Sequence, residues 1–445
     1  MKYALFVLLT LPAFAQDTRT VVEPSIPPSC TVLPAKLPKH LSDADESKLD
    51  TARIQEALDH CSAGHAVELK ADGEAASFLS GPLQLRAGVT LLVDAHVTLY
   101  GSRNPRDYDI TPGACGTVDK GGRACKPLIG GTDIAGAGVM GEGVINGRGN
   151  AKLLGQNVSW WDLAQEAKVK NLNQNCPRIL VLNHADNFTL YKIELKNSPN
   201  FHVSYNGGNG FTVWGIVIDT PKAGRNTDGV DPGNGSKNIT ITRSYINAGD
   251  DNVAVKGGGT APTENITISH NHFYAGHGVS IGSETYAGVR RMLVQDLSID
   301  GADNGIRIKS NETRGGEVSE IRYDDVCIRD TKNPILMDTH YSFAGTQANR
   351  IPRFTGIVLH DVRIEGPGKI TLDGFSPENL LGITFDGVTV SNLTQTKFVA
   401  HYASVTVGPG PVNFRPSGDG VTVKGEAGHG SLAACTSKFV PLPAR

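Results

Sequence analysis

The chain has 445 residues and a formal net charge of −3, with 20% charged and 39% hydrophobic residues. This balance excludes a disordered chain and a strongly basic nucleic-acid-binding protein. Glycine is abundant (52 residues), methionine is scarce (4 residues), and short β-branched runs follow one another along the sequence. Together these features favour an all-β protein with frequent turns over a helical one.

The first residues have the pattern of a secretory signal. Lys2 supplies a positive charge, Ala4–Leu11 is an apolar run, and Ala13–Ala15 is a cleavage site with a small residue at each end. We expect residues 1–15 to be removed, so that the mature chain begins at Gln16. The apolar run is too short to cross a bilayer as a helix, and no later stretch is apolar enough to do so. We therefore predict a secreted, extracellular protein with no membrane partner.

One segment near the N-terminus has helical periodicity. In Asp43–Cys61, the apolar residues Leu49, Ile54 and Leu58 fall on one helical face, together with Cys61 at its end. A single helix at this place is expected to cap the open end of a β structure, because such a cap covers exposed backbone groups.

Seven cysteines follow the signal, and an oxidising compartment permits disulfides. Cys30 and Cys61 flank the predicted helix, and Cys115 and Cys125 bracket a Gly-rich loop, so we expect both pairs to be bonded. At least one thiol must then be free among the remaining three, which are Cys176, Cys327 and Cys435. The chain has no Cys-x-x-Cys pair, and we predict no metal and no cofactor.

The middle of the chain repeats one nine-residue pattern. It reads NFTLYKIEL from Asn187, GFTVWGIVI from Gly210, NITITRSYI from Asn238 and NITISHNHF from Asn265. Looser copies begin at Met292, Glu320, Gly356 and Gly382. Apolar and polar residues alternate within each copy, which is the period of a half-buried strand.

Copies of this kind bury their apolar faces only by stacking on one another. The spacing is mostly 23 to 28 residues, which leaves room for about three short strands and little helix. The blade of a β-propeller needs about 40 residues or more, and the Leu-x-x-Leu-x-Leu pattern of leucine-rich repeats is missing. The sequence therefore predicts a right-handed parallel β-helix forming one domain over residues 16–445, with an irregular C-terminal cover after about Thr396.

Four polar clusters recur in step with the repeat. They are Asn226–Gly229, Gly249–Asp251, Gly276–Gly278 and Arg307–Lys309. Successive coils of a β-helix stack at roughly 4.8 Å, so the clusters are expected to lie side by side on one face. Residues two apart in a strand point the same way, as Arg307 and Lys309 should.

The adjacent pair Asp250 and Asp251 needs a different backbone. A regular strand sends neighbouring side chains to opposite faces, so both reach one face only if the chain bends there, and Gly249 permits such a bend. Each cluster alone is most often a turn or a solvated strand. All four clusters follow the period of the repeat, and this agreement favours one functional site over four unrelated turns.

Three carboxylates gathered on one face repel one another. Two charges about 5 Å apart at an effective dielectric constant near 20 interact by roughly 3 kcal/mol, which corresponds to about two pKa units. One carboxyl should therefore keep its proton while the others are ionised, as glycoside hydrolysis requires. The cations of the last cluster would bind an anionic sugar, since arginine matches a carboxylate and lysine adds a point charge.

With these motifs in place, the chain resembles the polygalacturonases, the pectin-cleaving glycoside hydrolases of family 28. The motifs NTDG, GDD, GHG and RIK of that family occur here in order. The resemblance covers most of the mature chain and is closest to bacterial secreted endo-acting members, through segments such as CGTVDKGGRAC, VSWWDLA, NSPNFHV and GHGVSIGSE.

The resemblance implies hydrolysis of α-1,4-linked galacturonic acid in polygalacturonate or pectin, with inversion at the anomeric carbon. It assigns the general acid to Asp250 and the activation of water to Asp228 and Asp251, and it places His277 beside the acid. Spacing alone leaves open which residue of the Asp250–Asp251 pair is the acid. The resemblance also implies a set of substrate-binding residues, namely Asn226, Arg307, Lys309 and Tyr341.

Other readings of the same residues stay open. A pectate lyase on this architecture would use calcium held by aspartates, whereas here a histidine and two cations accompany the carboxylates. A non-catalytic carbohydrate-binding β-helix would not need adjacent carboxylates facing cations. A rhamnogalacturonan hydrolase typically lacks the Arg-x-Lys motif, and an exo-acting enzyme remains an alternative. We expect a monomer, and a core or loop anchor rather than a sugar platform at Trp160 and Trp161.

Overall fold

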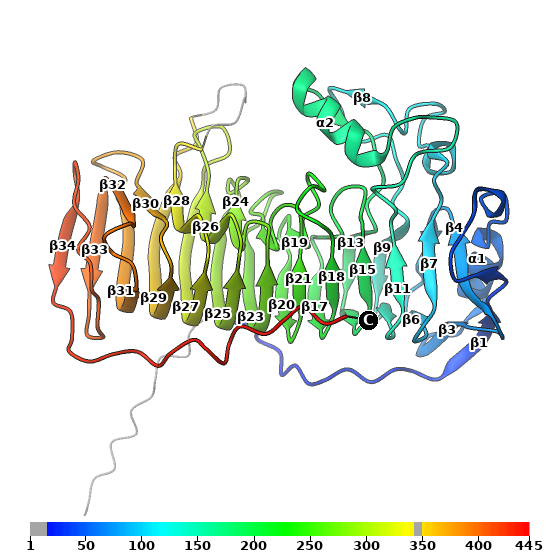
Figure 1. Cartoon of the computed structure of the whole chain (residues 1–445), viewed down its shortest axis with the longest axis horizontal. Coiled ribbons are helices and arrows are strands. Elements are labelled where there is room, and N and C mark those ends of the chain that lie inside the picture. Colours follow the sequence, from blue (N-terminus) through cyan, green and yellow to red (C-terminus); the bar gives the residue numbers. More distant parts are fainter. Residues whose placement is uncertain (1–15, 342–348, 445) are drawn as a thin grey trace, which may run out of the picture.

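A computed structural model describes residues 16–341 and 349–444. The predicted signal, residues 1–15, lies outside the described residues. Strands stack in parallel along one long axis, with few helices, as Figure 1 shows. The protein is the right-handed parallel β-helix that the sequence predicts.

The face that carries the polar clusters is an eleven-stranded sheet in which every strand pairs in parallel with the next. Its strands are, in order, β5 (Leu83–Gln84), β9 (Ile129–Ala135), β13 (Leu180–Asp186), β16 (Val203–Asn206), β19 (Val230–Gly233), β22 (Val253–Val255), β24 (Val279–Gly282), β26 (Asn304–Lys309), β28 (Asn333–Asp338), β30 (Lys369–Asp373) and β32 (Lys397–His401).

A 21-stranded sheet forms the remaining faces. Its strands are β1 (Ser29–Pro34), β2 (Leu37–Pro38), β3 (His65–Lys70), β4 (Ala75–Ser80), β6 (Val89–Val93), β7 (Thr98–Gly101), β10 (Gly138–Met140), β11 (Val144–Asn146), β14 (Phe188–Tyr191), β15 (Glu194–Lys196), β17 (Asn209–Trp214), β18 (Val217–Asp219), β20 (Lys237–Thr242), β21 (Tyr245–Asn247), β23 (Thr263–Tyr274), β25 (Val289–Asp300), β27 (Glu317–Arg329), β29 (Arg353–Glu365), β31 (Leu381–Val390), β33 (Ala403–Val407) and β34 (Thr422–Gly425).

The repeated sequence pattern forms one corner of each coil and the strand that follows it. Asn187, Asn238 and Asn265 open their copies with φ between 49° and 61°, a left-handed conformation that asparagine and glycine adopt more readily than other residues. The next residue of each copy then points inward. These inward residues stack in register, from Phe188 on Phe211 through Ile239 and Ile266, and they form a continuous buried core.

The N-terminal cap is shorter than predicted. The helix expected over Asp43–Cys61 is divided into a 3-10 turn, η1 (Asp43–Asp45), and the helix α1 (Thr51–His60). Ile54 and Leu58 are buried as expected, but Leu49 is 41% exposed. The division arises because the Asp45 carboxylate accepts hydrogen bonds from Ser42 and from Lys48, which stabilises a separate turn. In Figure 1, α1 lies at the same end of the solenoid as β1.

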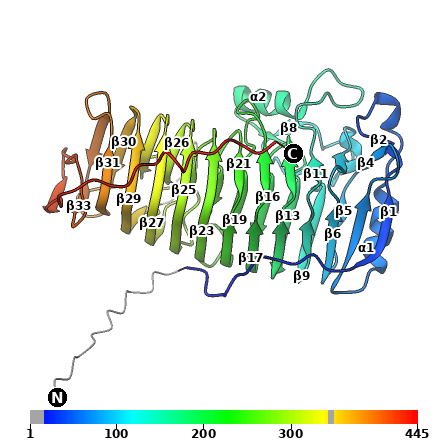
Figure 2. The ribbon, with the colours of Figure 1, turned by 60° about the horizontal axis from the view of Figure 1, so that its bottom comes forward.

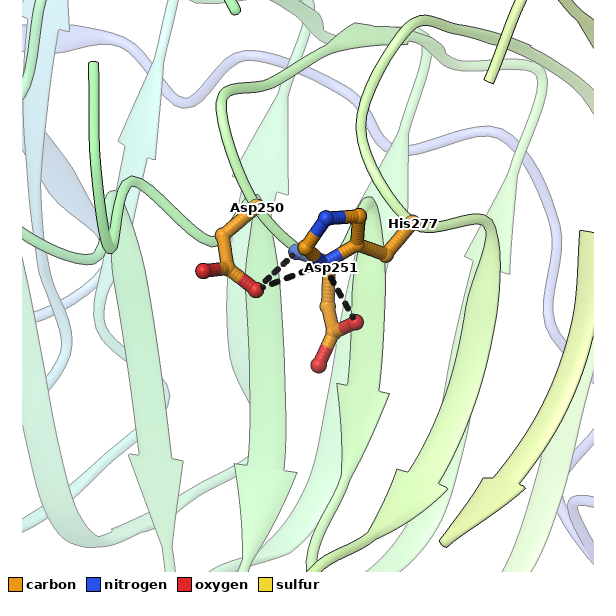
Figure 3. A group of neighbouring side chains, drawn as sticks. All are labelled: Asp250, Asp251 and His277. Carbon is orange, nitrogen blue, oxygen red and sulfur yellow. Dashed lines mark hydrogen bonds and ion pairs between the residues drawn. The ribbon is translucent and has the colours of Figure 1, made fainter. Parts of the chain in front are cut away.

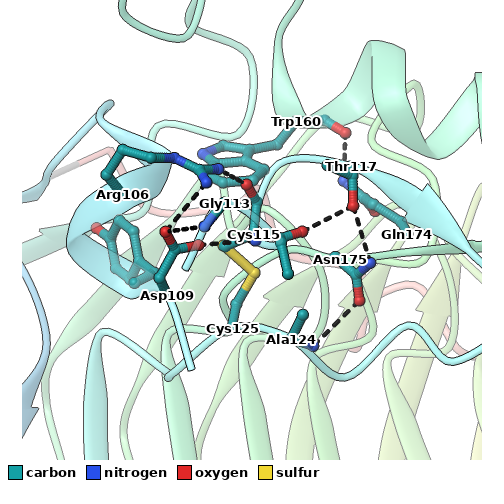
Figure 4. The surroundings of a disulfide bond; sticks show 12 residues. Arg106, Asp109, Gly113, Cys115, Thr117, Ala124, Cys125, Trp160, Gln174 and Asn175 are labelled. Carbon is teal, nitrogen blue, oxygen red and sulfur yellow. Dashed lines mark hydrogen bonds and ion pairs between the residues drawn. A yellow bond between two sulfur atoms is a disulfide. The ribbon is translucent and has the colours of Figure 1, made fainter. Parts of the chain in front are cut away.

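The sequence analysis did not predict a second helix, α2 (Trp160–Lys170), which begins with a capping box at Ser159. It lies near the loop between Cys115 and Cys125, whose disulfide is present as predicted and is shown in Figure 4. Trp160 is fully buried and meets Tyr108 edge to face. The Trp161 indole nitrogen donates a hydrogen bond to the Ser198 carbonyl. Both tryptophans are therefore anchors, and they hold α2 with the short strands β8 (Val118–Asp119) and β12 (Asn173–Gln174) over the solenoid.

The C-terminal region departs from the prediction. The repeat does not stop near Thr396, since β32, β33 and β34 add further pairings to both sheets. These copies were missed because their Gly- and Pro-rich connections hide the alternation. The connection between β33 and β34 is irregular, and so are the residues after β34, which run back along the outside of the coils in Figure 2.

Two further disulfides hold the ends of the chain. Cys30–Cys61 is present as predicted, and Cys327–Cys435 ties the C-terminal segment to the side of the solenoid. Cys176 is left as a free thiol, in agreement with the odd number of cysteines. Three disulfides are typical of a protein that folds in an oxidising compartment. Among the described residues, no helix is long and apolar enough to span a bilayer.

Candidate active site

The four polar clusters lie on neighbouring strands of the eleven-stranded sheet. The first three precede β19, β22 and β24, and the fourth ends β26. Val230, Val253, Val279 and Ile306 pair in register across these strands. The sheet therefore brings together residues that are up to about 80 positions apart in the sequence.

The chain bends between Gly249 and Asn252, just before β22, as the adjacent aspartates require. Asp250 and Asp251 lie outside any strand, and the backbone nitrogen of Asp251 donates to Asp250 Oδ1 at 3.0 Å. A Cβ at Gly249 would lie 1.9 Å from the Gly224 carbonyl oxygen, so glycine is required at this position. Both carboxylates consequently approach the same histidine.

Asp251 is a buried carboxyl held by two cations. Arg307 Nη1 donates to its Oδ1 at 3.0 Å and Lys309 Nζ donates to its Oδ2 at 2.9 Å. Ser280 Oγ adds a hydrogen bond to Oδ1 at 2.6 Å. Burial opposes ionisation of this carboxyl, but the charge of Lys309, the hydrogen bond of His277 and the charge of Arg307 together hold its pKa well below the usual value.

His277 joins the two aspartates, as Figure 3 shows. Its Nδ1 lies 3.0 Å from Asp250 Oδ1 and 3.6 Å from Asp251 Oδ1. Burial disfavours the charged ring, but the hydrogen bonds to Asp250 and Asp251 outweigh burial and raise the pKa of His277 to about 9. Burial likewise opposes ionisation of Asp250, yet the hydrogen bond from His277 lowers the pKa of Asp250 below its usual value.

Asp228 has the opposite environment. It is 4% exposed, and the nearest cation is Lys256, whose Nζ lies 3.8 Å from Oδ2. Burial, together with repulsion from Asp231 and Asp250, raises the pKa of Asp228 well above its usual value. The sequence predicted one protonated carboxyl, the acid, among ionised ones. In the free protein the surroundings favour the proton on Asp228 and not on Asp250, the residue that the resemblance makes the acid.

The remaining predicted residues lie around this centre. The Tyr341 ring is 5.6 Å from the Arg307 guanidinium and 5.6 Å from the Lys309 ammonium, and its backbone nitrogen donates to the Ser310 carbonyl. Asn226 occupies the turn before Asp228 with φ 55°. All the residues singled out from the four clusters, with Tyr341, thus belong to one region of the sheet.

Sequence reasoning missed several polar residues of the site. Ser280 contacts Asp251, and Asp303 Oδ2 lies 4.0 Å from His277 Nε2. Lys256 and Asp231 form a close pair beside Asp228, with Nζ and Oδ2 3.2 Å apart. A signal for Asp231 and Lys256 was present, because Asp231 follows Asp228 by three residues and Lys256 follows the GDD motif by five.

Among the residues that the structure describes, two groups of side chains have the composition of a metal site. One is Asp250, Asp251 and His277, and the other is Asp338, His340 and Asp373 farther along the same sheet. In the first group the contacts of Arg307 and Lys309 to Asp251 place two positive charges where a cation would bind. This arrangement differs from the carboxylate cage that a calcium-dependent lyase uses.

The family model of the glycosyl hydrolases family 28 matches residues 61–407. This chain belongs to that family. The match spans all four polar clusters, and the enzyme is therefore a glycoside hydrolase.

Curated relatives extend the likeness over nearly the whole chain. An endo-polygalacturonase of Pectobacterium carotovorum subsp. carotovorum is 44% identical over 393 residues, covering 88% of this chain and 94% of that protein. A polygalacturonase of Ralstonia solanacearum is 40% identical and covers 95% of this chain and 92% of that protein. Among solved structures, the polygalacturonase from Erwinia carotovora ssp. carotovora superposes with a TM-score of 0.82 at 43% identity, covering 88% of this chain and 100% of that one.

Proposed function

We propose that this family 28 enzyme hydrolyses α-1,4-glycosidic bonds inside polygalacturonate chains, with inversion of the anomeric configuration. The observation that carries the proposal is the contact of Arg307 and Lys309 with a buried carboxylate beside Tyr341. Two cations beside a pair of carboxylates of the kind that catalyses glycoside hydrolysis can bind a sugar that itself bears a carboxylate. The endo-acting relatives support cleavage within the chain.

Asp250 serves as the general acid that protonates the leaving glycosidic oxygen. In the free protein its pKa is lowered by His277, so that the proton resides on the imidazolium. A bound galacturonate excludes water, which disfavours both charged members of the Asp250–His277 pair. Substrate binding thus favours transfer of the His277 proton to Asp250 Oδ1, across their 3.0 Å contact.

Asp228 and Asp251 orient and deprotonate the attacking water. The water oxygen forms the new bond to the anomeric carbon on the face opposite the leaving group, and an ionised carboxylate accepts its proton. Asp251 is ionised in the free protein, whereas Asp228 can accept this proton only after it has lost its own. Arg307 and Lys309 bind the carboxylate of the sugar, Tyr341 lies beside it, and Asn226 shapes the turn that carries Asp228. The enzyme acts as a secreted monomer on polygalacturonate or pectin.

A product profile on polygalacturonate tests the function. We expect a mixture of oligomers in the first minutes and no increase in ultraviolet absorbance with calcium. Monomer or dimer from the outset would indicate an exo-acting enzyme, and calcium-dependent absorbance would indicate a lyase. Inversion is tested by proton NMR at the first turnover, where the product should be the β anomer, and an α product would contradict it.

A further inference from the structure

The side of the site toward the N-terminus contains a second ion pair that the proposed mechanism does not use. Asp231 lies in β19, three residues after Asp228, and is 4% exposed. Lys256 follows β22 and extends back over β19, so that Nζ is 3.2 Å from Asp231 Oδ2 and 3.8 Å from Asp228 Oδ2. One ammonium group is therefore shared by two buried carboxylates.

The Lys256 side chain is also held in place by the ring of a neighbouring phenylalanine. Its Nζ lies 4.7 Å from the centre of the Phe201 ring, and the Arg178 guanidinium lies 4.2 Å from the same ring. Neither oxygen of Asp231 has a hydrogen-bond partner among the described residues. A buried carboxylate without hydrogen bonds is costly unless a charge compensates for it, and here the compensating charge is Lys256.

We infer that Lys256 is a positioning residue, which holds the Asp228 carboxylate in the site and favours its ionised form, and that Asp231 limits this effect by competing for the same ammonium group. The inference rests on the proposed role of Asp228 as a base. A base must be ionised to accept the proton of water, and a carboxylate buried among other carboxylates needs a cation to become so.

The charges around Asp228 agree with this role. Repulsion from Asp231, Asp250 and Asp251 and burial raise the pKa of Asp228, and Lys256 opposes them. Asp231 faces Asp228 and Lys256 from the coil of Asp228 itself. The charged or titratable groups that surround them from other coils are Arg178, His202, Asp250, Asp251 and Glu284. Of these, Arg178 acts on Asp231 and Glu284 acts on Lys256, and His202 Nδ1 lies 2.9 Å from the backbone oxygen of Asp228.

The test measures kcat/KM as a function of pH. It compares the acidic limb of this profile in two variants that are expected to shift it in opposite directions. Lys256→Gln removes the cation, so the limb should move up by about one pH unit or more. Asp231→Asn frees the ammonium for Asp228 and removes a repulsion, so the limb should move down. Lys256→Arg keeps the charge and should restore most of the wild-type profile, and the exposed Lys424 provides the matched control Lys424→Gln.

The double variant Lys256→Gln/Asp231→Asn should return the limb toward the wild-type position, because it removes both opposing charges. The inference would be overturned if the acidic limb kept its wild-type position in both single variants, or if it moved in the same direction in both. A rise in KM alone in Lys256→Gln would also overturn it, since that result assigns the lysine to substrate binding.

A measurement without substrate separates this inference from the proposed function. Carbon-13 NMR of the Asp228 carboxyl in the free protein should show titration at higher pH in Lys256→Gln than in the wild type, and at lower pH in Asp231→Asn. This outcome supports the positioning role even if the enzyme releases no oligomers from polygalacturonate. Identical titration curves in all three proteins would overturn it.

Discussion

On the two sides of the site, a buried carboxyl group has different charged neighbours. Toward the C-terminus, Asp251 has two cations of its own and a hydroxyl donor. Toward the N-terminus, Asp228 shares the single ammonium group of Lys256 with Asp231. Burial is nearly the same on both sides, at 1% exposed for Asp251 and 4% for Asp228. The difference in pKa direction therefore comes from the ratio of cations to carboxylates and not from depth.

This contrast explains how adjacent coils of one repeat carry out different chemistry. The backbone of each coil is nearly equivalent, and the strands pair in register. Function depends on which charged residues replace apolar ones at equivalent positions. In the free protein the ionised Asp251 therefore lies near a carboxyl, Asp228, that retains its proton, so the two residues proposed to activate water differ in charge before substrate binds.

The largest effect is expected when the proposed acid loses its ability to carry a proton. Asp250→Asn should lower kcat by about 10³-fold or more, while polygalacturonate still binds. Asp324→Asn is the matched control, because Asp324 also pairs with a histidine, His360, at 2.7 Å but lies outside the site. Near-normal turnover of Asp250→Asn would contradict the assignment of the acid.

The sequence predicted the fold and the gathering of the four polar clusters because both follow from local periodicity, whereas Tyr341 and the role of each residue came from the family resemblance. Alternation gave the strands, the 23-to-28-residue spacing gave the coils, and a fixed register placed Asp228, Asp251, His277 and Arg307 side by side. The direction of each pKa did not follow, because it depends on contacts between coils. Asp231 and Lys256 stand close to the motifs in the sequence, but only the structure shows that both lie beside Asp228.

Other features depended on long-range contacts that no local pattern records. The partner of Cys327 is Cys435, 108 residues away, and the choice among three remaining cysteines could not be made from spacing. Helix α2 was missed because it lies in the long connection between β11 and β12, outside the strand repeat, although its Trp160 and Leu163 join the main core. The last coils were missed because Gly- and Pro-rich connections separate β33 from β34.

An intermediate effect is expected on the cation-rich side. Arg307→Ala or Lys309→Ala should lower kcat/KM on polygalacturonate by about 10²-fold. Each substitution removes one of the two cations that pair with the buried Asp251 carboxylate, and it also removes a positive charge that binds the carboxylate of the substrate. The loss should be smaller on fully methyl-esterified pectin, whose sugars lack the negative charge. Arg290→Ala, which breaks an ion pair with Glu264 elsewhere on the solenoid, is the control. Equal losses on both substrates would contradict the role in carboxylate binding.

A smaller effect is expected on stability as the pH changes. The pKa of His277 is raised to about 9 from 6.5, so the folded protein binds this proton more tightly than the unfolded chain. Its contribution to stability is fully present below about pH 6.5 and is lost as the pH rises through about 9.

Thermal melts of the wild type and of His277→Gln between pH 6 and pH 10 measure this contribution. The Tm difference between the two proteins should narrow as the pH rises. His360→Gln, which removes a histidine paired with Asp324 outside the site, provides the control. A difference that stays constant or widens would show that His277 is not charged in the folded state.

The division of charge between the two sides is tested most directly by carbon-13 NMR titration of the aspartate carboxyl groups in the free enzyme. Asp228→Asn and Asp251→Asn variants assign the resonances. We predict that the Asp228 carboxyl titrates well above the usual range for aspartate, while the Asp251 resonance stays in its ionised position below that range. If Asp251 titrated at a higher pH than Asp228, the electrostatic account of this active site would be wrong.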